Sequence, residues 1–128
     1  MTRKSVSTSA APPALGPYSQ AIVAQGLVFC SGMPGIDPAT GSVPDGIEAQ
    51  TEQALQNLGE VLTAAGSSLD RLVKTTIFYA DVDDFAALND VYGRYMPDPP
   101  PARSAPANVQ LPRGLLVSID AIATLDEA

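Results

Sequence analysis

A nearly unbroken apolar segment near the end of the chain, residues 115–124, constrains the fold more than any other feature. Only Ser118 and Asp120 interrupt it before Thr124. Its β-branched residues indicate a strand, and a strand with so few polar positions needs cover on both of its faces. A fold for this chain must therefore supply two covering layers.

Two amphipathic helices are the most clearly patterned of the other elements. The first begins at Asp45 or Gly46, keeps apolar residues three and four apart, and ends at the cap residue Gly66. The second follows the acidic pair 83–84 and is stopped by a proline-rich stretch that starts at Pro97. Its apolar face consists of Phe85, Leu88, Val91, Tyr92 and Tyr95.

Further extended segments complete a sheet. Two short apolar runs around a Gly-containing turn predict a hairpin, and two later segments also read as extended; the four segments are 18–24, 27–31, 72–80 and 102–111. Pro106 cannot donate to a ladder, so the last of these lies at an edge or contains a bulge. A Gly- and Pro-rich loop, 32–46, precedes the first helix.

The predicted order β-β-α-β-α-β-β describes one α+β domain. A chain of 128 residues has room for a single core, which we assign to residues 13–128 after a mobile lead at 1–12. Two helices can cover only one face of the sheet. Since the last strand is apolar on both faces, we expect a homo-oligomer in which the sheets of different subunits pack together.

The composition excludes several kinds of site. The chain has no histidine, so it holds no Ser-His-Asp triad and no histidine metal ligand. Its one cysteine, Cys30, excludes an internal disulfide or a multi-cysteine zinc site, and we expect no metal or cofactor. A net charge of −7 disfavours nucleic-acid binding. No apolar run is long enough for a membrane span, which together with the lone cysteine predicts a cytoplasmic protein.

Two charged residues stand out as candidates for chemistry. Arg103 follows a proline run and begins an extended segment, where its planar guanidinium suits a carboxylate, although it could equally pair with one of the chain's own acidic residues. Asp120 interrupts the apolar strand, so it either points to solvent or faces a polar site. The interior-strand context of Asp120 favours the site.

Other candidates carry weaker signals, each with an ordinary structural alternative. Tyr18 lies where the first apolar run begins and could be a core tyrosine. Ser31 and Gly32 end the next run, as in any strand-end turn. Asn89 could be an exposed helix residue or could bond a loop. Cys30 lies in an apolar strand without a basic neighbour, which predicts an inert thiol.

Taken together, short motifs along the chain resemble the RidA/YjgF/YER057c/UK114 family of reactive intermediate deaminases from about Pro13 to Thr124. The motifs are Gly16–Gln20, Ser31–Gly32, Asp37–Pro38, Thr40–Gly41, Lys74–Phe78, Asp84–Phe85 with Asn89 and Tyr92, Pro101–Ser104, and Ile119–Ala123. The resemblance implies a chorismate-mutase-like subunit, with a mixed sheet and two helices on one face, that forms a homotrimer with sites between subunits.

The resemblance also implies an activity and roles for residues. Family members hydrolyse imines and enamines such as 2-aminoacrylate and 2-iminobutyrate to 2-keto acids and ammonia. In this chain Arg103 would hold the substrate carboxylate. Tyr18, Ser31, Gly32, Asn89 and Ala105 would contact the substrate. Asp120 stands where relatives commonly have a glutamate, thought to position water, and Ala105 stands where they often have Cys or Thr.

Two other functions remain open from the sequence. A binding or sensing protein could use Arg103 to capture a 2-keto acid without a working Asp120. An endoribonuclease is a second alternative, which the absence of histidine and the acidic balance of charges disfavour. Imine hydrolysis suits the composition better, because a protonated imine is already electrophilic and needs only a carboxylate anchor, a held water and modest acid–base help.

Overall fold

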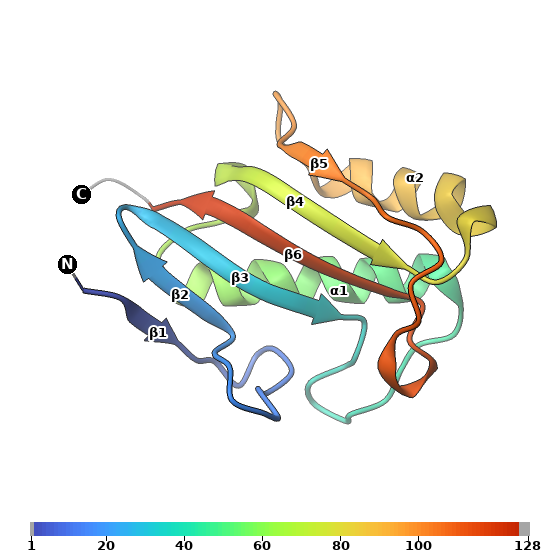
Figure 1. Ribbon diagram of the computed structural model, residues 1–128, viewed down its shortest axis with the longest axis horizontal. Helices are drawn as coiled ribbons and strands as arrows, with labels where there is room; N and C mark the ends of the chain where they lie inside the picture. The colour runs from blue at the N-terminus through green and yellow to red at the C-terminus, as the bar shows by residue number, and fades with distance from the viewer. Residues whose placement is uncertain (1, 126–128) are drawn as a thin grey trace.

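The apolar segment forms strand β6, Val117–Thr124, in the interior of a sheet in the computed structural model, which describes residues 2–125. The sheet has the order β1-β2-β3-β6-β4-β5 within those residues (Figure 1). The other strands are β1 Lys4–Val6, β2 Ala21–Ala24, β3 Leu27–Pro34, β4 Leu72–Tyr79 and β5 Ala102–Ser104. β4 and β5 run parallel and the other pairs antiparallel, so the expected mixed sheet is confirmed.

Both α-helices lie behind the sheet in the view of Figure 1. Helix α1, Gly46–Ala64, contacts β3 and β6, and helix α2, Phe85–Tyr95, packs beside α1. Short 3₁₀ helices η1 Leu69–Arg71, η2 Val82–Asp84 and η3 Pro112–Gly114 join the larger elements. The described residues thus form an α+β fold with two helices on one face, as expected.

Burial alternates strictly along β6. Val117, Ile119, Ala121 and Ala123 are buried on the side that the helices cover. Their neighbours Ser118, Asp120, Ile122 and Thr124 are half-buried on the other side. That second side also carries an apolar row across the register, in which Ile22 opposes Phe29 and Phe29 opposes Ile122. Phe29 is 41% exposed.

The N-terminal residues differ from our expectation of a mobile lead at 1–12. Lys4–Val6 pairs with β2 as an edge strand. The buried Gln20 amide then holds the segment that follows: its Oε1 accepts the Thr8 amide at 2.7 Å, and its Nε2 donates to the Pro12 carbonyl at 2.8 Å. A strand of three residues is too short to show a periodic pattern in the sequence. The hydrogen bonds of the Gln20 side chain join residues that are 8 to 12 positions apart, which no local pattern marks either.

The extended segment expected at 102–111 is also shorter than predicted. Only Ala102–Ser104 pairs with β4, at the edge of the sheet. Beyond it, the Pro106 carbonyl accepts from the Tyr79 amide at 3.4 Å, and Asn108 has a left-handed backbone with φ of 61°. Pro106 has no amide hydrogen to continue a ladder, which explains the early end of the strand.

Candidate active site

Arg103 lies on the edge strand β5, where it pairs in register with Thr75 of β4. Its side chain reaches toward helix α2, and its Nη1 donates to Asn89 Oδ1 at 2.7 Å. The guanidinium carbon lies 5.0 Å from the ring centre of Tyr92 and 5.6 Å from that of Phe85. Within residues 2–125 no carboxylate forms an ion pair with Arg103, whereas Arg94 pairs with Asp90 at 2.6 Å.

An open groove of about 580 Å³ lies beside the guanidinium. Its lining includes Asn89, Tyr92, Met96, Pro100, Pro101 and Arg103. The prolines that end α2 therefore form one wall, and Arg103 supplies the positive charge. Such a groove offers an anion an exposed cation with neutral surroundings.

Asp120 lies on the uncovered face of the sheet, opposite a β-bulge in β3. Cys30 pairs with Ala121 and Met33 pairs with Ile119, so two residues, Ser31 and Gly32, face the single position Asp120. A Cβ on Gly32 would lie 2.6 Å from Ser118 Oγ, which shows how closely the bulge approaches β6. On its other side Asp120 opposes Thr76 of β4.

Tyr18 and Ser31 lie together near this bulge. Ser31 Oγ donates to the Ser19 carbonyl at 2.6 Å, and the Ser31 amide donates to the Gln20 carbonyl at 2.9 Å. Tyr18 is 53% exposed on the loop before β2. An open groove of about 640 Å³ brings Tyr18, Ser31 and Phe29 together. A more enclosed apolar cavity of about 340 Å³ lies nearby, lined by Tyr18, Gly32, Met33 and Arg113 among others.

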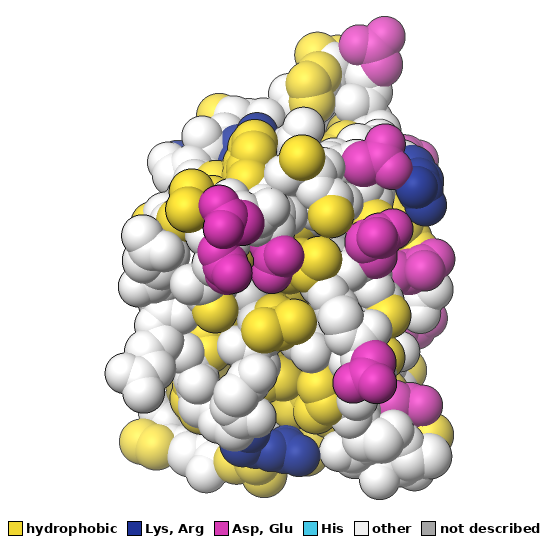
Figure 2. Space-filling model, turned by 90° about the vertical axis from the view of Figure 1, so that its right-hand side faces the viewer, with side chains coloured by type: hydrophobic (Ala, Val, Ile, Leu, Met, Phe, Trp, Pro, Cys, Tyr) yellow, Lys and Arg dark blue, Asp and Glu magenta, His cyan; other side chains and the backbone are white. Residues whose placement is uncertain are grey.

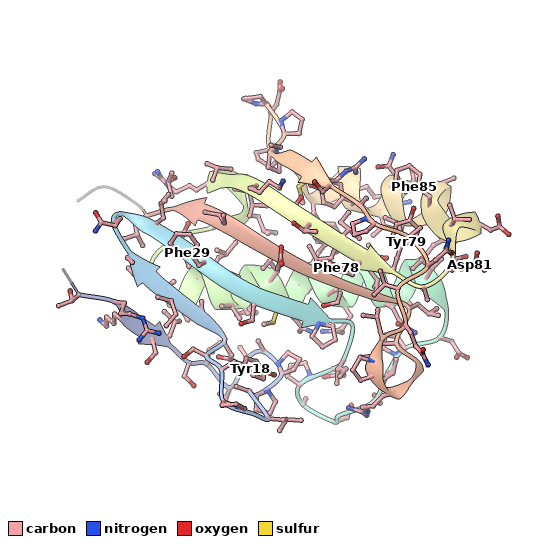
Figure 3. All side chains as sticks on the ribbon, viewed as in Figure 1. Tyr18, Phe29, Phe78, Tyr79, Asp81 and Phe85 are labelled. Carbon is pink, nitrogen blue, oxygen red and sulfur yellow. The ribbon has the colours of Figure 1, made fainter. Side chains whose placement is uncertain are left out.

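The sequence-predicted site residues thus fall into two groups. Arg103 and Asn89 form one group on the side of the helices. Tyr18, Ser31, Gly32 and Asp120 form the other, toward the uncovered face. Figure 3 shows the separation through Tyr18, below β2, and Phe85, beside α2. None of the three hollows lined by Tyr18 includes Arg103 in its lining, so one chain alone does not bring the two groups onto one ligand.

Ala105 belongs to neither group. It follows β5 and packs, half-buried, against the hydrophobic core. It is absent from the lining of the Arg103 groove. A contact between Ala105 and substrate stays a prediction.

Cys30 is buried on the helix-covered side of β3. Burial, reinforced by the nearby negative charge of Asp120, raises the pKa of the Cys30 thiol to about 12. A thiol with so high a pKa is protonated at neutral pH and is a poor nucleophile. The geometry agrees with the inert thiol that the sequence predicts.

Three residues near Arg103 were not identified as site residues from the sequence. Phe85 and Tyr92 were assigned to the apolar face of the second helix and Thr75 to a strand, and all three fall in motifs of the family resemblance, but none was given a role in the site. Tyr92 OH and Thr75 Oγ1 lie 2.7 Å apart in the interior. The usable signal was the spacing of Phe85, Asn89 and Tyr92, which places them on one helix face, but it also describes an ordinary core stripe.

Residues 2–125 contain neither a candidate metal site nor a candidate membrane span. No group of three or more Cys, Asp or Glu side chains there is arranged to hold a metal ion. In the same range, no helix is both long and apolar enough to cross a membrane.

Comparison with known proteins identifies the family. The family description "Endoribonuclease L-PSP" matches residues 8–125. Reactive Intermediate Deaminase A, chloroplastic, of Arabidopsis thaliana is 51% identical over 121 residues. The chain belongs to this family. The expected membership of the RidA/YjgF group is thereby confirmed.

The match extends over nearly all of this chain but not over all of each relative. It covers 94% of the chain and 65% of the Arabidopsis protein. The 2-iminobutanoate/2-iminopropanoate deaminase of Capra hircus is 46% identical, with 96% of this chain and 90% of the relative covered. These names agree with the expected class of enzyme, a deaminase.

A solved structure supports the fold in detail. The crystal structure of E. coli TdcF with bound serine matches with a TM-score of 0.90 and 35% identity. The match covers 96% of this chain and 99% of TdcF. The cytoplasmic location predicted from the sequence stays a prediction, since one relative is named as chloroplastic.

Proposed function

We propose that this protein hydrolyses 2-imino and enamine acids, of the 2-aminoacrylate and 2-iminobutyrate type, to 2-keto acids and ammonia. The observation that carries the proposal is the set of groups that contact the Arg103 guanidinium. In a chain with 14 acidic and 7 basic residues, this guanidinium is held by an amide and two aromatic rings, and no carboxylate of residues 2–125 pairs with it. Its charge is therefore available to the carboxylate of a ligand.

The reaction needs little beyond that anchor. Water adds to the imine carbon to form a C–O bond, and the C–N bond then breaks to release ammonia. Asp120 can accept a proton from the attacking water and pass it to the nitrogen, and the hydroxyl of the carbinolamine then gives up its proton to the nitrogen by the same route as the C–N bond breaks, which leaves the carbonyl and ammonia. This assignment requires no histidine, thiolate or metal.

The site proposed here forms between subunits of a homotrimer of the chorismate-mutase-like type. Two observations support this arrangement. Arg103 and Asp120 lie on different sides of the sheet in one chain, so a second copy is needed to bring both to one ligand. The apolar row of Ile22, Phe29 and Ile122 on the uncovered face supplies a surface for sheet packing.

The relatives support the substrate class. The Capra hircus protein is named for 2-iminobutanoate and 2-iminopropanoate, and TdcF was crystallised with serine, an α-amino acid with a free carboxylate. RNA cleavage is less well supported, because the chain carries a net charge of −7. Figure 2 shows Asp and Glu side chains gathered over the end of the molecule that faces its viewer.

A coupled assay tests the proposal. A serine or threonine dehydratase generates the imine, and capture by semicarbazide reports how much survives. We expect the purified protein to reduce capture sharply and the Arg103→Ala variant to leave it unchanged. A parent protein that binds 2-ketobutyrate without hastening imine decay would instead establish the sensing function. A parent protein with neither property would refute both.

A further inference from the structure

Helix α2 presents a row of three side chains to the Arg103 guanidinium. Phe85, Asn89 and Tyr92 follow the spacing i, i+4, i+7 and so share one face of the helix. The Asn89 side chain accepts one hydrogen bond at 2.7 Å. The two rings lie at centroid distances of 5.6 Å and 5.0 Å, within the range of cation–π attraction.

Tyr92 is itself fixed from the strand side. Its hydroxyl lies 2.7 Å from Thr75 Oγ1, and both residues are buried, with Thr75 at 0% and Tyr92 at 5% exposure. Thr75 is also the register partner of Arg103 across the β4–β5 ladder. The contacts therefore close a circuit: backbone of Arg103 to Thr75, Thr75 to the Tyr92 hydroxyl, and the Tyr92 ring to the guanidinium.

We infer that Tyr92 is a positioning residue for the carboxylate anchor, an inference that rests on the proposed role of Arg103. The ring supports the guanidinium, and the bond to Thr75 fixes where the ring lies. Asn89 occupies one amino group, Nη1, of a fork that carries five N–H donors. The donors that remain are then held in a set orientation toward the groove, as bidentate recognition of a carboxylate requires.

Substitutions of Tyr92 separate the ring from the hydroxyl. Tyr92→Leu removes both, and we expect about two- to fivefold weaker binding of 2-ketobutyrate, the magnitude of an exposed cation–π contact. Tyr92→Phe keeps the ring and should recover part of that loss. In imine turnover the change should fall mainly on KM, since the carboxylate is held both in the bound substrate and in the transition state and its binding is weakened equally in the two. Tyr95→Phe, on the same helix but bonded to Glu52, is the matched control and should change nothing.

A double-mutant cycle tests whether the effect passes through Arg103. In an Arg103→Ala background, Tyr92→Leu should cause no further loss of affinity for 2-ketobutyrate. An equal loss in both backgrounds would overturn the inference, because Tyr92 would then act on the ligand or the fold without the guanidinium. Should Tyr92→Leu fail to fold, Phe85→Leu, which removes the half-buried second ring, takes its place in the same cycle.

Proton NMR of the Arg103 side chain gives a reading that does not depend on turnover. The two rings should shift its resonances by ring currents, and Tyr92→Leu should remove part of that shift while Tyr95→Phe leaves it intact. Unshifted Arg103 resonances in the parent would overturn the inference whatever the protein binds. Shifted resonances without any binding of 2-ketobutyrate would refute the proposed function. The contact between the rings and Arg103 would then be real, but Arg103 would not be a carboxylate anchor.

Discussion

Thr75 and Thr76 are consecutive residues of β4, and each lies beside a different half of the candidate site. Thr75 is buried on the helix side, where its hydroxyl meets Tyr92 beneath Arg103. Thr76 points to the uncovered face, where it opposes Asp120 in the β4–β6 ladder. Since successive side chains of a strand alternate between faces, a single strand separates the cation from the carboxylate.

Mixed oligomers should therefore recover activity from two inactive variants. Arg103→Ala and Asp120→Asn subunits, refolded together in equal amounts, should form about one intact site in four if each site takes Arg103 from one subunit and Asp120 from its neighbour. The measurement is imine turnover of the mixture against each variant refolded alone. If the mixture is no more active than its components, either one subunit supplies both residues to a site, or Arg103 and Asp120 do not share a site.

Replacement of Arg103 should abolish activity without unfolding the protein. Arg103→Ala removes a charged hydrogen-bonding group, which weakens carboxylate binding by roughly 10- to 150-fold. Arg103→Lys should also lose most activity, because lysine offers a point charge and no planar fork. Imine turnover and melting temperature are measured together for each variant. Full turnover by folded Arg103→Ala would contradict the assignment.

Asp120→Asn should separate chemistry from binding. The two side chains have nearly equal volume, so the bulge opposite residue 120 stays in place, but the amide cannot accept a proton. We expect turnover to fall while the dissociation constant of 2-ketobutyrate changes little. Calorimetric titration beside the coupled assay provides the comparison. A variant with unchanged turnover would exclude Asp120 as the acid–base group.

Gly35→Ala should destabilise the fold at the junction of β3 and the loop before α1. An added Cβ would lie 2.3 Å from the Gln50 carbonyl oxygen, which is helix backbone and cannot rotate away. We expect a loss of about 1–3 kcal/mol in unfolding free energy, as for other overpacked positions. Gly59→Ala is the control, because its new Cβ would meet only the Leu69 side chain at 3.4 Å. Urea denaturation of both variants measures the difference.

Alkaline pH should weaken the fold through Cys30. The unfolded thiol ionises near pH 9, while burial and Asp120 raise the folded pKa to about 12. Between these values the folded state holds the extra proton, so the unfolding free energy falls as pH rises, by up to about 1.4 kcal/mol per pH unit. Cys30→Ala should lack this component. Equal pH slopes for parent and variant would show that the thiol does not contribute.

The sequence predicted the elements with strong periodicity and missed those held by distant contacts. The 19-residue α1 and the strand β6 have patterns long enough to define both type and face. The strand β1 has three residues and depends on pairing with β2, so no local pattern marks it. Pro106 indicated an edge or a bulge, and β5 does lie at the edge, but Pro106 did not indicate how few residues would pair before it.

The residues of the candidate site likewise include some that the sequence identified and some that it missed. Asp120 was identified because its charge interrupts an apolar strand, and Arg103 because it follows a proline run and begins an extended segment. Both signals can be read from the order of residues alone. Tyr92 agrees with its surroundings as an apolar helix residue, so its contact with Arg103 could not be separated from ordinary packing. The distribution of side chains between the two faces required the register of three strands, which composition and spacing do not supply.

The bulge in β3 also sets the phase of the strand. Val28 and Cys30 are buried before it and Met33 after it, so the buried positions change from even to odd numbers. Removal of Gly32 would leave Ser31 alone opposite Asp120 and would restore a regular alternation with every buried side chain still facing the helices. The core is therefore compatible with a strand that is one residue shorter. The extra residue changes only the uncovered face, where two residues instead of one lie opposite Asp120.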